Sequence, residues 1–195
     1  MTTQKKVKLS QKSICLPTTI LGGHNPNPLF ETYQGRPYPF KEELSDEESV
    51  RNDSWCGHNP YPYAYAYMDA DRKLQDRDYL LLVMENEFLR IEFLPHLGSR
   101  IHRIFDKTIQ QDLIHHAQQV VMQYLPGTSG GTYVGVGMEL SIPDHHSLTN
   151  SREREYQTFK HEDGSASIVA GELDLRYKMR WSMEFSLKPG DAKLD

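Results

Sequence analysis

A strict alternation of apolar and polar residues near the end of the sequence constrains the fold most. In YKMRWSMEFSL, every second side chain from Met179 to Leu187 is apolar, and the residues between them are Arg, Ser and Glu. A period of two places the apolar side chains on one face of an extended chain. The segment therefore predicts a β-strand that buries one face.

A β-hairpin is predicted earlier, where YLLLVM and FLRIEFL are joined by ENE. In its second strand Leu89, Ile91 and Phe93 point one way, and Arg90 and Glu92 point the other way. One face of this hairpin is therefore expected to be buried.

Further strands are predicted at SRIHRIF, VVMQYL and VGMELSIP, and DKTIQQD predicts a turn. EDG at 162–164 predicts a second hairpin, between REYQTFKH and SASIVAGEL, because glycine adopts positive φ readily. No long amphipathic pattern competes, so the sequence predicts an all-β, antiparallel β-sandwich. After the KPGD turn, AKLD begins another alternating strand, and we expect the sequence to be a fragment of a longer protein.

The first 70 residues read as irregular, because proline and tyrosine recur in HNPNPLF, QGRPYPF and HNPYPYAYAYMD. Four tyrosines at a spacing of two share one face, and they either clad the core or offer an aromatic platform to sugar rings: Tyr61, Tyr63, Tyr65 and Tyr67. We expect residues 1–78 to pack as an extended segment on a sandwich formed by residues 79–195, truncated at its C-terminus.

Composition excludes several classes of protein. The net charge is -5 and no basic stripe is present, which argues against nucleic acid as a partner. No apolar run approaches the roughly 20 residues of a membrane helix, and no signal peptide is recognisable. Cys15 and Cys56 form no CxxC pair, so we expect a reduced, cytoplasmic protein.

Glu139 and Arg100 are the predicted substrate-binding residues with the most suitable chemistry. Glu139 lies in the predicted strand VGMELSIP, where it is either a solvent-facing residue or a partner for sugar hydroxyls. It is also the candidate general acid or base, although whether any reaction is catalysed is left open. Arg100 follows Gly98 and suits bidentate contacts with hydroxyls or carboxylates; pairing with a nearby acidic residue is the alternative.

His145 and His146 are expected as hydrogen-bond donors of a polar pocket or as residues of a surface loop. Adjacent residues of a strand point to opposite faces, so neither this pair nor His115 and His116 should bind one ion together. No HExxH, GxSxG, Walker or dinucleotide-binding motif is present. We therefore expect no metal and no cofactor.

Three segments carry a resemblance to a known family: MENEFLRIEFLPHLGSRIHRIFDK, GGTYVGVGMELSIPDHH and EDGSASIVAGELDLRYKMRWSMEFSLKPGDAKLD. Together with YQGRPYPF and NPYPYAYAYMD, they resemble a bacterial family of unknown function. That family has a galactose-mutarotase-like supersandwich and usually stands N-terminal to tetratricopeptide repeats. This chain departs from the family pattern at Ser99 and at residues 140–142.

The resemblance implies a carbohydrate ligand, with Glu139 as one of its contacts. The function expected first is therefore a carbohydrate-binding or carbohydrate-processing domain. The alternative is a non-catalytic structural or interaction module that pairs with tetratricopeptide repeats, with another chain or with a second copy of itself.

Overall fold

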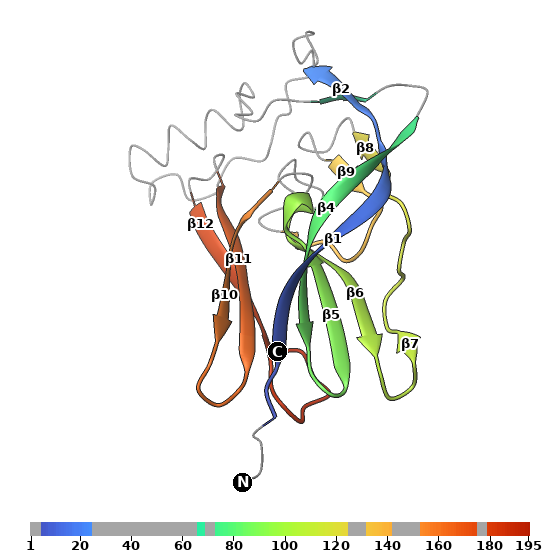
Figure 1. The fold of residues 1–195 in the computed structure, drawn as a ribbon. Coiled ribbons are helices and arrows are strands. Elements are labelled where there is room, and N and C mark those ends of the chain that lie inside the picture. Colours follow the sequence, from blue (N-terminus) through green and yellow to red (C-terminus); the bar gives the residue numbers. More distant parts are fainter. Residues whose placement is uncertain (1–4, 25–65, 69–72, 125–131, 142–152, 175–178) are drawn as a thin grey trace, which may run out of the picture.

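The computed structural model describes residues 5–24, 66–68, 73–124, 132–141, 153–174 and 179–195. These residues form an all-β fold, as the sequence predicts, and contain no α-helix (Figure 1). The elements are β1 (Lys8–Thr19), β2 (Leu21–His24), β3 (Ala66–Met68), β4 (Leu74–Glu85), β5 (Leu89–Leu94), the 3-10 turn η2 (Pro95–Leu97), β6 (Arg100–Asp106), β7 (Gln111–Asp112), β8 (Met122–Tyr124), β9 (Thr132–Val134), β10 (Glu155–Lys160), β11 (Ala166–Asp174) and β12 (Met179–Leu187). None of the described helical segments is long and apolar enough to span a bilayer.

Two antiparallel sheets make up most of the structure. The larger has the strand order β1-β4-β5-β6-β7, and the smaller has the order β10-β11-β12 (Figure 1). The pairs β2–β3 and β8–β9 form two short additional sheets. The arrangement is consistent with the predicted β-sandwich.

The centre of the five-stranded sheet is buried on both faces. One apolar cluster lies between the two large sheets and includes Leu82, Ile91, Phe93, Ile168 and Phe185. A second cluster covers the opposite face and joins β4 to β8 and β9; it contains Leu81, Val83, Met122 and Val134, among others. Leu81 and Leu82 are neighbours in sequence but belong to different clusters, because successive side chains of a strand alternate between its faces.

The predicted hairpin at residues 79–94 is confirmed, and Asn86 explains its turn. The Oδ1 atom of Asn86 accepts hydrogen bonds from the backbone N–H groups of Phe88 and Leu89, both at 2.8 Å. Its Nδ2 atom donates to the carbonyl oxygens of Lys188 (2.8 Å) and Asp191 (2.7 Å). One buried amide therefore closes the turn and fastens it to the turn after β12.

The predicted hairpin at EDG is also confirmed, since β10 and β11 pair antiparallel around it. Gly164 has φ +86°, the left-handed conformation that glycine tolerates. In β12 the predicted alternation is largely confirmed: Trp181, Phe185 and Leu187 are buried and residues 180, 182 and 184 are exposed, whereas Met183 and Ser186 are both half-buried.

Two predictions made from local pattern differ from the structure. Residues 8–19 lie in the part expected to be irregular, but they form β1, which pairs along its full length with β4. Conversely, VGMELSIP contributes only a single bridge, between Met138 and Ile101, in its described part. Gly137 has φ +60°, which interrupts the extended chain immediately before that bridge. AKLD likewise forms one bridge, between Leu194 and Leu187.

Candidate functional site

Arg100 holds backbone carbonyls together inside the structure. Its side chain is 1% exposed, and its guanidinium donates to the carbonyl oxygens of Leu97 (2.9 Å), Val134 (2.7 Å) and Val136 (2.6 Å). These bonds tie the turn before β6 to the segment that contains β9. This geometry favours a structural role, and the predicted contact of Arg100 with a ligand stays a prediction.

Glu139 lies one residue beyond the bridge between Met138 and Ile101. It is partly buried, and its Oε1 atom accepts a hydrogen bond from the Ser141 hydroxyl at 2.8 Å. The Arg100 guanidinium donates to backbone carbonyls, whereas the Glu139 carboxylate accepts a hydrogen bond from Ser141. His145 and His146 lie outside the described residues, as do Tyr61, Tyr63 and Tyr65.

Gly137 explains why the sequence is rich in glycine just before Glu139. A Cβ atom at this position would lie 2.3 Å from the carbonyl oxygen of Ile101 and 3.0 Å from the Cα atom of His102. The chain therefore passes directly against the backbone of β6, which a larger residue would prevent.

A second buried arginine, Arg154, was not singled out from the sequence. Its Nη1 atom donates to the carbonyl oxygens of Gly98 (2.9 Å) and Leu140 (3.1 Å). Its guanidinium also lies 4.8 Å from the ring centre of Trp181 and 3.4 Å from the Glu172 carboxylate. Arg154 stands in the charged run RERE, which is typical of an exposed segment, so local pattern offered no signal for its burial.

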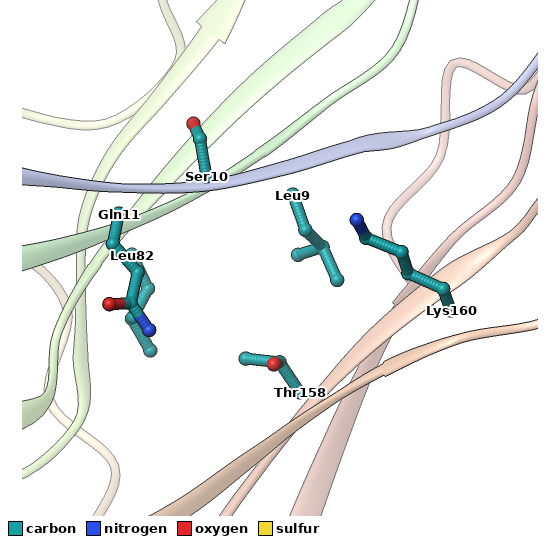
Figure 2. A pocket seen from close by; sticks show the side chains of 6 residues that line it. All are labelled: Leu9, Ser10, Gln11, Leu82, Thr158 and Lys160. Carbon is teal, nitrogen blue, oxygen red and sulfur yellow. The ribbon is translucent and has the colours of Figure 1, made fainter.

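An open groove lies between the edge strands of the two large sheets. Its volume is about 470 Å³, and its lining comes from β1, β4 and β10: Leu9, Ser10, Gln11, Leu82, Thr158 and Lys160. Leu9 and Thr158 point into the space from opposite sides, and Lys160 reaches from β10 toward β1 (Figure 2). Leu82, which belongs to the core between the sheets, provides an apolar floor. The sequence did not predict this groove, because β1 was not predicted.

A polar cluster gathers on β5, β6 and the loop after β7. It consists of Glu92, His102 and His116, whose ligand-type atoms all lie within 4.8 Å of one another. Glu92 and His102 are buried, and His116 is partly exposed. Among the described residues this is the group of histidine, cysteine and acidic side chains that could hold a metal ion.

A β-bulge places His102 beside Arg103 in this cluster. Glu92 pairs with Arg103 and Phe93 pairs with Ile101, so His102 is the extra residue between the two pairs. Bulges re-aim side chains and are frequent next to active sites. The Arg103 guanidinium pairs with Asp112, whose carboxylate in turn lies 3.8 Å from His116 Nδ1.

The pKa of His102 is lowered to about 4, mainly by burial of the ring and to a smaller extent by the nearby His116. The imidazole of His102 is therefore neutral near pH 7. The hydrogen bond from Arg103, which outweighs the effect of burial, lowers the pKa of the Asp112 carboxyl, so Asp112 is ionised at that pH.

Comparison with known protein families decides the relationship of this chain. A family model described as "Domain of unknown function (DUF5107)" matches residues 57–195. The chain belongs to this family. The DUF5107 match contains the whole polar cluster and the β10 side of the groove, whereas the β1 side precedes it.

The DUF5107 domain also resembles part of a solved structure, described as a TPR-domain containing protein from Parabacteroides distasonis ATCC 8503. The two share 20% sequence identity with a TM-score of 0.73, and the likeness covers 98% of this chain. The chain spans 28% of the length of that protein. At this level of identity the comparison shows a shared fold.

Proposed function

We propose that this DUF5107 domain is a non-catalytic interaction module that docks on tetratricopeptide repeats, either of the same protein or of a partner. The observation that carries the proposal is the groove between β1 and β10, where the edges of two sheets flank an apolar floor. The shared fold with part of a TPR-domain containing protein supports the choice of partner.

The charges around the groove favour a helical partner surface over an added β-strand. Lys160 lines the groove, and Lys8 and Lys12 are exposed on the edge strand β1, where they alternate with the groove-lining Leu9 and Gln11. Lysine on an edge strand opposes the pairing of further strands. The same ammonium groups complement an acidic surface and raise its rate of association. The proposed partner surface is therefore acidic and helical.

The test uses the tetratricopeptide-repeat domain of the Parabacteroides distasonis protein, expressed without its own copy of this fold. Titration calorimetry and size-exclusion chromatography with light scattering should detect a complex with a Kd on the order of micromolar. The double variant Gln11→Glu/Lys160→Glu, which changes two residues that line the groove, should bind at least about tenfold more weakly, which corresponds to about 1.4 kcal/mol.

The matched control is Lys188→Glu/Lys193→Glu, which reverses two exposed charges on the turn after β12 and should bind as the original domain does. The proposal fails if both double variants lose binding equally. It also fails if no complex forms at protein concentrations of roughly 100 µM, far above the expected Kd.

Carbohydrate binding is the second candidate, because Gln11, Thr158 and Lys160 offer amide, hydroxyl and ammonium groups to sugar hydroxyls. No aromatic ring stands among the described residues that line the groove, so a stacking surface is absent there. A melt in the presence of monosaccharides and short glycans separates the two candidates, since a ligand of the folded state raises the Tm. An increase in Tm with a sugar that is lost in Thr158→Val would favour carbohydrate binding in the groove. If Glu139→Gln binds the sugar with unchanged affinity, Glu139 is not one of its contacts.

A further inference from the structure

The contact between His102, a core residue, and His116, a partly exposed loop residue, brings two imidazole rings together. Their Nε2 atoms are 3.1 Å apart, and the rings meet edge to face with centroids 4.8 Å apart. His102 is fully buried, and its Nδ1 atom has no hydrogen-bond partner among the described residues. Buried polar atoms are normally satisfied, and among the described residues the side-chain hydrogen-bond contact of His102 is with the second imidazole.

The spacing of the two Nε2 atoms fits a shared metal ion. Zinc binds histidine nitrogen at about 2.0–2.1 Å in a tetrahedron, so two nitrogen ligands lie about 3.3 Å apart. The Nε2 atoms of His102 and His116 are already near this separation. A Glu92 carboxylate oxygen lies within 4.8 Å of a ring nitrogen of each histidine, and it has to move closer by roughly 1.5 Å or less to complete the same shell.

The side chains behind the cluster resemble those that orient metal-binding histidines. The Asp112 carboxylate lies 3.8 Å from His116 Nδ1, on the other side of the ring from Nε2. A carboxylate behind the distal ring nitrogen accepts its N–H, fixes the tautomer and leaves the other nitrogen to bind metal. The Arg90 guanidinium holds the Glu92 carboxylate. Its Nε and Nη2 atoms both contact the same carboxylate oxygen, Oε1, at 2.7 Å.

We propose that Glu92, His102 and His116 bind a divalent transition-metal ion of the zinc type. Two imidazoles and one carboxylate suit zinc, whereas magnesium prefers an all-oxygen shell. Three protein ligands leave one position of a tetrahedral ion for water or another small ligand. β5 and β6 are separated from β1 by β4, so the site is independent of the groove and of the proposed repeat docking.

The test begins with tag-free protein that has been treated with a chelator and dialysed. Titration with Zn²⁺ should show one ion per chain with a Kd on the order of micromolar or tighter, and the bound ion should raise the Tm. Co²⁺ bound at the same site should give the visible absorption of a tetrahedral ion, which Zn²⁺ displaces. Mg²⁺ should give neither effect.

His116→Ala is the decisive variant, because His116 lies in a loop and is partly exposed, so its replacement should leave the fold intact. It should weaken Zn²⁺ binding at least tenfold and abolish the Co²⁺ absorption. His115→Ala, which removes the neighbouring exposed histidine, is the matched control and should bind both ions normally. Asp112→Asn should weaken binding by roughly ten- to one-hundred-fold.

The proposal is overturned if the original domain binds no Zn²⁺, or if His116→Ala binds it unchanged. Equal losses in His115→Ala and His116→Ala would also overturn it, because they would indicate scattered binding to surface histidines. A circular dichroism melt of each variant without metal establishes that the fold is retained.

Discussion

Gly137 gives a sharp test of how the chain crosses β6. Gly137→Ala adds a Cβ atom 2.3 Å from the carbonyl oxygen of Ile101, a distance that forces the backbone to move. The bridge beside it consists of two hydrogen bonds, from Ile101 N to Met138 O at 3.2 Å and from Met138 N to Ile101 O at 2.7 Å. A shift of the chain away from β6 weakens both.

The expected magnitude follows from these contacts. An alanine at positive φ costs about 1–2 kcal/mol, of which about 0.4–1 kcal/mol is regained from the less flexible unfolded chain. Weakening two backbone hydrogen bonds adds about 0.5–1.5 kcal/mol for each. The free energy of unfolding should therefore fall by about 2–4 kcal/mol, which corresponds to roughly 5–15 °C in Tm for a chain of this size.

Gly190→Ala is the control, because Gly190 also has positive φ (+77°), but among the described residues its Cβ would meet only the Glu87 carboxylate, at 3.7 Å. It should lose less than about 1.5 kcal/mol, the backbone contribution alone. Urea and thermal unfolding of both variants measure the difference. Equal losses would refute the reasoning, since they would show that the close approach to Ile101 contributes nothing.

Two further predictions concern charged side chains. Arg100→Met removes the donor for three buried carbonyls and should lower the free energy of unfolding by about 3 kcal/mol or more; a urea titration that shows less than about 1 kcal/mol would argue against an anchoring role. For Glu85, burial raises the pKa, but the hydrogen bond and charge of Lys107 outweigh it, so the folded-state pKa is lowered. The stabilisation is therefore present above the unfolded-state pKa and is lost as the pH falls through the folded-state value. Glu85→Gln should cost up to about 1 kcal/mol near pH 7 and nothing in acid; a difference in urea stability that persists near pH 3 would contradict this assignment.

The strands that the sequence predicted best are those with a clear apolar alternation or a turn residue within the same short segment of sequence. β12 alternates because one face packs on the five-stranded sheet, and the two hairpins are marked by turn residues, Asn86 and Gly164. β1 escaped prediction because it is an edge strand that exposes much of its length, so its apolar pattern is weak. Its pairing with β4 is a contact between residues far apart in sequence, which no local pattern contains.

The candidate sites show the same limit. Arg100 had the chemistry of a ligand-binding residue, but its acceptors lie up to 36 residues away in sequence, and they became evident only in the fold. His102 was overlooked because a bulge interrupts the period of β6. The argument that adjacent histidines cannot share an ion is compatible with the cluster, which takes His116 and not His115. The partners of His116 come from two other strands, and only the sheet order brings them together.

The burial of β4 on both faces has a consequence for how the sequence can drift. A half-exposed strand leaves every second position open to polar replacement, but Leu81, Leu82, Val83 and Met84 are all buried. Four consecutive positions are thus restricted to apolar residues of similar volume, since a polar side chain at any of them enters one core or the other. Substitutions in this strand are therefore expected mainly at its exposed N-terminal residues, 74–78. The N-terminal end of β4 tolerates polar replacements, and the buried C-terminal end does not.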